Sequence, residues 1–214
     1  MATSKFHHEE IYRGVDYTKK LQGLVTVCGV GALGSNLLDH LSRQGFPKLR
    51  GIDMDRVSVH NLSTQFWNER DIGALKVQAA CTKIFANVGV EIEIIDKELT
   101  VANVERFLKG SALVVDCFDN SSSRQILQTH CRAKKIPCLH LGLSSDYGEC
   151  IHDDCYKVPK DSEGDICDYP LARNIIMLTV SVGAEEILDM FLSTKPRHKS
   201  WSVTLRDLKI NEHF

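Results

Sequence analysis

The chain has 214 residues, a formal net charge of −2 and a hydrophobic fraction of 43%. This length and composition indicate a globular chain with an ample core, and the near-neutral charge argues against nucleic acid or a membrane surface as a partner. No secretory signal is recognisable, and the longest apolar stretch, 174–184, is too short to span a bilayer. These features predict a cytoplasmic protein whose eight cysteines are free thiols.

Apolar segments alternate with amphipathic segments along the chain, which is typical of a mostly parallel sheet with helices on both faces. We expect one α/β, Rossmann-like domain over 1–214, with an N-terminal arm (1–20), an exposed crossover loop (about 157–168) and antiparallel strands near the C-terminus. The predicted strands are 24–28, 49–53, 90–95, 112–117, 138–143, 149–156 and 201–205. The predicted helices are 32–44, 74–87, 101–108, 122–134 and 170–192.

The first predicted strand runs directly into a glycine-rich turn, Gly29-x-Gly31-Ala32-Leu33-Gly34. In this pattern the first glycine permits a tight turn, the second lets the main chain approach a phosphate, and the third allows close helix packing. The free N–H groups at the start of the helix then favour an anion. Because the pattern follows a strand and opens a helix, it predicts a nucleotide site.

An acidic residue, Asp53, ends the second predicted strand. It lies about 20 residues past the glycine loop, which is the spacing of an acid that holds ribose hydroxyls. The nearby Asp55 either caps a turn or contacts the nucleotide or a metal. A nicotinamide-dependent oxidoreductase would explain the loop and Asp53, but it would leave the polar residues that follow unexplained.

Further motifs along the chain favour ATP over a redox cofactor as the ligand of this site. With them, the chain resembles the ThiF/MoeB/ubiquitin-activating superfamily of ATP-dependent adenylating enzymes over residues 24–124. The matching motifs after the glycine loop are Asp53-x-Asp55-x-Val57, Asn61-Leu62-x-x-Gln65, Gly73-x-x-Lys76, and Asp116-Cys117-Phe118-Asp119-Asn120 with Arg124.

The resemblance implies ATP and Mg²⁺ as cofactors and a role for each matching residue. Asp53 would hold the ribose, and Asn61 and Gln65 would line the triphosphate. Lys76 would neutralise charge at the α-phosphate, and Asp119 would hold Mg²⁺. The implied roles of Lys76 and Asp119 also agree with the chemistry, since a carboxylate that attacks a phosphate brings two anions together, and a cation and a metal must offset the charge.

One position departs from the family pattern. Where the family usually has an arginine that contacts the γ-phosphate, this chain has Thr64. Candidate substitutes are Arg70 and Arg13, the latter because an N-terminal arginine reaches the partner's pocket in homodimeric members. Either the triphosphate is bound differently or the chain is slow or inactive; we favour the first, because the other motif residues remain.

The cysteines give two further expectations. Cys155 resembles the first residue of a zinc-binding C-x-x-C pair that has lost its second cysteine, so we predict no zinc site. Cys167 precedes the last long helix, where the family's thioester- or persulfide-forming cysteine occurs. A helix N-terminus would favour its thiolate, whereas Asp165 and Asp168 would oppose it, so Cys167 is either a covalent catalyst or an incidental loop thiol.

The resemblance therefore implies an adenylyltransferase acting on the C-terminal carboxylate of a small ubiquitin-like or sulfur-carrier protein that ends in glycine. Thioester transfer to Cys167 and then to a downstream acceptor could follow. A single adenylation unit implies a homodimer, with helix 171–192 as a candidate interface element. The alternatives are a carboxylate on tRNA or a small peptide as substrate, and an inactive scaffold subunit of a heterodimer, which Thr64 would favour.

Overall fold

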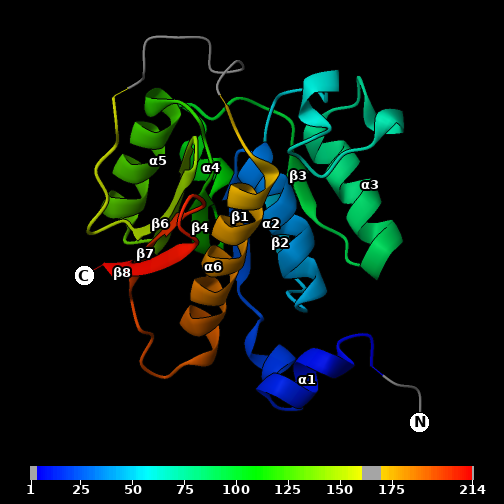
Figure 1. Cartoon of the computed structure of the whole chain (residues 1–214), viewed down its shortest axis with the longest axis vertical. Coiled ribbons are helices and arrows are strands. Elements are labelled where there is room, and N and C mark those ends of the chain that lie inside the picture. Colours follow the sequence, from blue (N-terminus) through cyan, green and yellow to red (C-terminus); the bar gives the residue numbers. More distant parts are fainter. Residues whose placement is uncertain (1–3, 161–169, 214) are drawn as a thin grey trace.

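The computed structural model describes residues 4–160 and 170–213, and these form an eight-stranded sheet in the order β3-β2-β1-β4-β5-β6-β7-β8 (Figure 1). The strands are β1 (Leu24–Cys28), β2 (Leu49–Ile52), β3 (Glu93–Ile95), β4 (Ser111–Asp116), β5 (Cys138–Ser144), β6 (Tyr147–His152), β7 (Ser200–Thr204) and β8 (Lys209–His213). The α-helices are α1 (His7–Arg13), α2 (Ala32–Arg43), α3 (Lys76–Val88), α4 (Val104–Phe107), α5 (Ser121–Lys134) and α6 (Arg173–Leu192).

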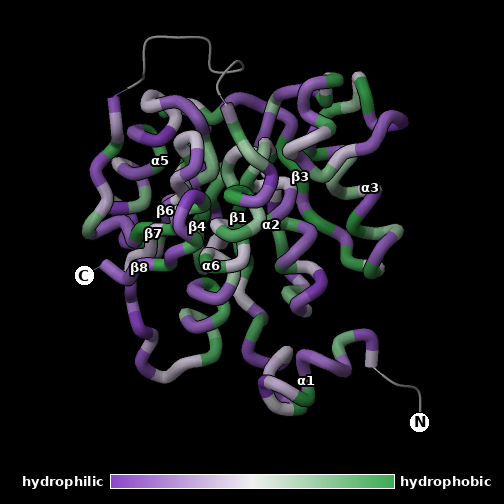
Figure 2. The backbone as a smooth tube through the Cα atoms, in the orientation of Figure 1, coloured by the Kyte–Doolittle hydropathy of each residue, from purple (hydrophilic) through white to green (hydrophobic). Residues whose placement is uncertain are grey.

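Strands β1 to β5 form a parallel half-sheet with β1 near its centre. Parallel strands that are covered on both faces need continuous apolar runs, and residues 25–28 of β1 and 113–116 of β4 are buried. Buried side chains of α2, α3 and α6 form one core with the sheet, and those of α4 and α5 form the other. Figure 2 shows hydrophobic residues concentrated on these strands and on the helix sides that face them.

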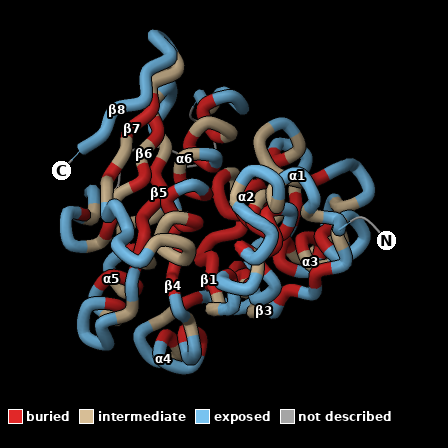
Figure 3. The backbone as a smooth tube through the Cα atoms, turned by 90° about the horizontal axis from the view of Figure 1, so that it is seen from below, coloured by how far each residue is buried: buried red, intermediate tan, exposed pale blue. Residues whose placement is uncertain are grey.

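Strands β6, β7 and β8 extend the sheet in antiparallel fashion. The predicted α/β class, with a mostly parallel sheet and antiparallel C-terminal strands, is therefore confirmed. Strand β8 was not predicted: it pairs with β7, but all five of its residues are exposed at the sheet edge (Figure 3). No helix in residues 4–160 and 170–213 is long and apolar enough to cross a bilayer.

Several predicted boundaries need correction. The arm at 1–20 contains α1 and a 3₁₀ turn, Tyr17–Lys20, and neither was predicted. The third strand starts at Glu93, not at residue 90: Val90 and Ile92 contribute buried side chains, but the backbone pairs with β2 only from Glu93 on. The sixth strand lies at 147–152. The last helix begins at Arg173, three residues after Pro170. Most of the expected crossover loop, with Cys167, lies outside the described residues.

Candidate functional site

The glycine loop between β1 and α2 uses each glycine differently. Gly29 has a φ of +86°, and a side chain there would lie 2.8 Å from the carbonyl oxygen of Cys117. A side chain on Gly34 would lie 1.9 Å from the carbonyl oxygen of Gly29, so this glycine lets α2 pack on the loop. A side chain on Gly31 would meet nothing within 4 Å. The loop is therefore closed by packing at its two ends and open at Gly31.

The open face of the loop presents backbone donors. The first hydrogen bond of α2 runs from the Ser35 amide to the Gly31 carbonyl oxygen at 3.0 Å. Within the described parts of the chain, the amides of Gly31, Ala32, Leu33 and Gly34 have no protein acceptor. Unpaired N–H groups together with the positive end of the helix dipole suit a phosphate. The residues present thus fit a nucleotide phosphate at this loop.

Asp53 holds the glycine loop against the end of β2. Its Oδ2 accepts a hydrogen bond from the Val30 amide at 2.7 Å, and its Oδ1 accepts one from the Asp55 amide at 2.8 Å. Burial raises the pKa of this carboxyl group, against the opposing effects of Lys76 and the two amides. Each carboxylate oxygen keeps a second lone pair, so Asp53 can still accept a hydrogen bond from a hydroxyl group.

Lys76 is the buried cation beside this loop. It is the first residue of α3, and its amide donates to the Asp55 carbonyl oxygen at 2.9 Å. Its Nζ lies 2.9 Å from Oδ2 of Asp55, whose side chain is 55% exposed. The backbone hydrogen bond and the side-chain ion pair, both to Asp55, together fix the position of the Lys76 amine. Asp55 therefore orients Lys76, and its exposed carboxylate keeps the pair accessible from solvent.

The loop that carries Asn61 and Gln65 packs beside the first turns of α2. Oδ1 of Asn61 accepts hydrogen bonds from the Ser58 amide and hydroxyl at 3.0 and 2.9 Å, which leaves its Nδ2 group without an acceptor among the described residues. Oε1 of Gln65 accepts from Trp67 Nε1 at 2.7 Å. Both amide side chains therefore have their carbonyl groups engaged and their NH₂ groups available for an anion.

The end of β4 lies against the same glycine loop. The Cys117 amide donates to the Cys28 carbonyl oxygen at 2.8 Å, which brings the following residues beside the end of β1. Asn120 caps α5 by accepting from the Ser123 amide at 2.8 Å. The carboxylate of Asp119 is exposed, and its neighbour is the Asn120 side-chain amide at 3.5 Å. Among the described residues, no group of three or more His, Cys, Asp or Glu side chains is placed to hold a metal ion.

Two residues singled out from the sequence, Arg124 and Arg13, are not brought to this site. Arg124 is buried and donates to the Tyr156 hydroxyl at 2.5 Å, so it links α5 to the segment after β6. Arg13 pairs with Glu9 and Glu185 on the side of the molecule opposite the glycine loop, where α1 lies (Figure 1). Cys167 lies outside the described residues. Arg13 therefore does not serve the site of its own subunit.

The surroundings of two cysteines near the glycine loop, Cys28 and Cys117, disfavour the thiolate form. Burial raises the pKa of Cys28 and Cys117 well above the usual value, and nearby Asp116 raises both further. All seven cysteines in the described part of the chain are free, as predicted.

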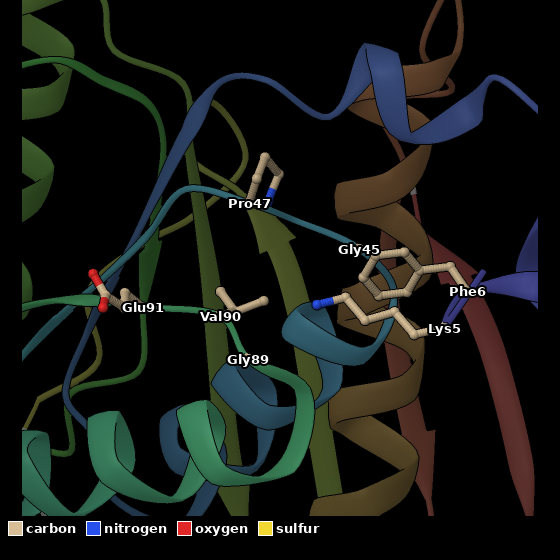
Figure 4. Close-up of a pocket in the computed structure, with 7 residues that line it drawn as sticks. All are labelled: Lys5, Phe6, Gly45, Pro47, Gly89, Val90 and Glu91. Carbon is tan, nitrogen blue, oxygen red and sulfur yellow. The ribbon is translucent and has the colours of Figure 1, made fainter. Parts of the chain in front are cut away.

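A cavity of about 390 Å³ lies away from the glycine loop. It is lined by residues on the α1 side of the sheet, among them Lys5, Phe6 and Glu91 (Figure 4). Gly45, in its wall, follows the last turn of α2, whereas the glycine loop precedes the first turn. The two sites are thus separated by the length of this helix, about 18 Å for 12 residues.

Two residues near the site, Asn36 and Arg173, were not predicted from the sequence. The Nδ2 group of Asn36, on α2, donates to the carbonyl oxygens of Ala32 at 2.7 Å and Thr64 at 3.0 Å, and so ties the loop to the helix. A polar residue on the buried face of an amphipathic helix was the available signal. Arg173 donates to the Ser63 carbonyl oxygen at 3.5 Å, and the 110 positions between them gave no signal.

Part of this chain is similar in sequence to known proteins. The ubiquitin-like modifier-activating enzyme 5 of Drosophila erecta is 32% identical in an alignment of 144 positions that covers 61% of this chain and 36% of that protein. The SAMP-activating enzyme E1 of Haloferax volcanii is 32% identical over 122 residues, 56% of this chain and 45% of that protein. The chain thus spans less than half the length of these relatives.

Solved structures show the same fold. The E. coli MccB structure with ATP superimposes with a TM-score of 0.82 at 16% identity, covering 98% of this chain and 71% of MccB. PaaA gives a TM-score of 0.77 at 19% identity, with coverage of 98% and 71%. The resemblance predicted from the motifs is confirmed by a match of the ThiF family to residues 9–204. The chain therefore belongs to the ThiF family.

Proposed function

We propose that this chain adenylates the C-terminal carboxylate of a small ubiquitin-like protein or a peptide, with ATP as the nucleotide. The observation that carries the proposal is the open glycine loop, whose unpaired amides at 31–34 lie at the same end of the sheet as Lys76 and Asp119. The names of the activating enzymes among its relatives support a ubiquitin-like substrate.

In the proposed reaction, a carboxylate oxygen of the substrate attacks the α-phosphorus of ATP. The bond from that phosphorus to the bridging oxygen breaks, and pyrophosphate leaves with its electron pair. Asp53 accepts hydrogen bonds from the ribose hydroxyls, and the amides at 31–34 together with Asn61 and Gln65 bind the phosphates. Lys76 offsets the charge that grows at the α-phosphate, and Asp55 keeps its amine in place.

Mg²⁺ would supply charge neutralisation across the phosphates when bound. It takes few ligands from protein and several from phosphate and water, and the single exposed carboxylate of Asp119 fits such a site. In the same proposal, the Cys167 thiolate attacks the acyl carbon of the adenylate, forms a thioester and releases AMP. A homodimer and a carrier that ends in glycine complete the proposal.

The test is ATP–pyrophosphate exchange with candidate carriers that end in Gly-Gly. We expect carrier-dependent exchange in the wild type and a loss of about 100-fold in Lys76→Ala, because a buried cation at the reacting phosphate is removed. Lys109→Ala, which changes an exposed lysine in the turn before β4, serves as the control and should leave exchange unchanged. Cys167→Ala should keep exchange but lose a reductant-sensitive adduct with the carrier.

The inactive scaffold remains the second candidate, because Thr64 stands where the family has an arginine. A scaffold needs neither Lys76 nor Asp119. Absence of exchange with every carrier, together with absence of nucleotide binding, would favour it over the enzyme.

A further inference from the structure

The charges around the open glycine loop are unbalanced for an anionic ligand. Asp53, Asp55 and Asp119 contribute three carboxylates, whereas Lys76 contributes one amine, which is already paired with Asp55. The unpaired amides of the loop and the helix dipole carry only partial charges. A triphosphate carries several negative charges, so in addition to the Mg²⁺ proposed at Asp119 the site favours a further cation toward the end of the phosphate chain.

Most other cations near the surrounding loops are already engaged. Arg56 donates to the Gly73 carbonyl oxygen at 2.7 Å. Lys83 is 3.0 Å from the carboxylate of Asp71. Arg124 is buried against Tyr156, and Arg13 is paired on the α1 side of the molecule. Among the exposed arginines near these loops, Arg70 and Arg173 make no ion pair and no side-chain hydrogen bond shorter than 3.5 Å to a described residue, so these two remain as candidates.

Arg173 is the first residue of α6, and this helix packs along α2. Both helices begin at the end of the sheet where β1 meets the glycine loop (Figure 1). The Arg173 side chain is exposed, and its Nη1 donates to the Ser63 carbonyl oxygen at 3.5 Å. The guanidinium therefore lies over the loop between Asn61 and Gln65, with donors left for another acceptor.

This loop connects Arg173 to the nucleotide face by short contacts. Ser63 precedes Thr64, whose carbonyl oxygen accepts from the Asn36 side chain at 3.0 Å. The same Asn36 amide donates to Ala32, the first residue of α2, at 2.7 Å. Arg173 is thus positioned at the edge of the first turn of α2. Its planar, permanently charged group suits bidentate binding of a phosphate.

We propose that Arg173 binds the terminal phosphates of ATP and supplies the cation that Thr64 does not. This inference rests on the proposed nucleotide site. It also gives α6 a functional first turn, because Arg173 is held there by the packing of α6 on α2. A nucleotide with a single phosphate is too short to use this contact, so the role of Arg173 is specific for the longer phosphate chain.

The test compares the equilibrium affinity of the purified protein for ATP and AMP by calorimetric titration. We expect Arg173→Ala to weaken ATP binding by about tenfold and to leave AMP binding unchanged, since one charge-assisted contact is lost. The ATP affinity of Arg173→Lys should lie between those of the wild type and Arg173→Ala, because lysine keeps the charge but loses the bidentate geometry. Arg43→Ala is the matched control: it removes an exposed arginine at the opposite end of α2 and should alter neither affinity.

Other results would overturn the inference. Unchanged ATP affinity in Arg173→Ala, or equal weakening of ATP and AMP, would show that Arg173 does not contact the terminal phosphates. A loss specific for ATP in Arg70→Ala alone would assign the role to Arg70. Failure of the wild type to bind either nucleotide would instead reject the proposed function, so the two failures are distinguishable.

Discussion

At the residue scale, the glycine loop separates packing from ligand binding. In Gly34→Ala the new methyl group would collide with backbone at Gly29, so α2 must shift; we expect the melting temperature to fall by at least about 4 °C. In Gly31→Ala the methyl group enters empty space, so stability should be unchanged. Because it fills the space of a phosphate, nucleotide affinity should fall at least about tenfold. Calorimetric melting and nucleotide titration measure both effects, and equal destabilisation by the two variants would contradict this division of roles.

The residues of the candidate site differ in how far the sequence could predict them. Gly31, Asp53 and Lys76 belong to motifs with fixed spacing, and the structure places all three at one end of the sheet. The pairing of Lys76 with Asp55 depends on how the start of α3 folds back onto the chain after β2. The position of Arg173 depends on the packing of α6 against α2. These last two relationships are set by tertiary contacts that local spacing does not encode.

At the element scale, α6 is attached to the antiparallel strands through one buried acid. Glu186 is fully buried and accepts hydrogen bonds from His152 at 2.9 Å, Trp201 at 3.0 Å and the Lys199 amide at 3.1 Å. Burial works to raise the pKa of Glu186, but these hydrogen bonds outweigh it, and the pKa is lowered. The carboxylate therefore stabilises the fold above its unfolded pKa, and this contribution is lost as pH falls through the lower folded pKa.

Glu186→Gln should therefore lower the melting temperature at pH 7 by about 5–10 °C, because it replaces a buried carboxylate that accepts three hydrogen bonds. The difference from wild type should shrink as pH falls below about 4.5, where Glu186 of the unfolded chain becomes protonated, and should be lost once pH falls below the lower pKa of the folded state. The neighbouring exposed residue offers a control: Glu185→Gln should change the melting temperature by less than about 2 °C. A difference between wild type and Glu186→Gln that stays constant down to pH 3 would contradict the role of the charge.

Sequence patterns predicted the elements that have apolar periodicity and missed those without it. Strand β8 has Ile210 as its one large apolar side chain, and it exists because its backbone pairs with β7. The first helix, α1, has no buried residue and is held by contacts such as Arg13 with Glu185. By contrast, the apolar runs of β1 and β4, buried at residues 25–28 and 113–116, made a parallel sheet covered on both faces predictable from the sequence.

At the scale of the whole molecule, the arrangement places the open loop, the buried amine and the exposed carboxylate at one end of a single sheet. The cavity beside Lys5 and Glu91 lies at the other end and shares none of these groups (Figure 4). Alternation of strands and helices predicted this end as the ligand side, because parallel strands present their carboxyl ends together. The sequence could not predict this cavity, because its lining comes from three separate segments: the residues before α1 and the turns after α2 and α3.

A ligand that binds this end should stabilise the entire fold, since the glycine loop, β2, β4 and α3 all contribute to it. With Mg²⁺ present and ATP at about 100 times its dissociation constant, linkage gives about 2.7 kcal/mol, or roughly 5–11 °C in melting temperature for a chain of this size. NAD⁺ at the same concentration should give no shift, because Asn61, Gln65 and Lys76 suit a triphosphate. Differential scanning calorimetry of the wild type and Gly31→Ala tests this, with the variant expected to lose the ATP shift. A melting-temperature shift with NAD⁺ as large as that with ATP would contradict the proposed adenylation and favour a dinucleotide as the ligand of this site.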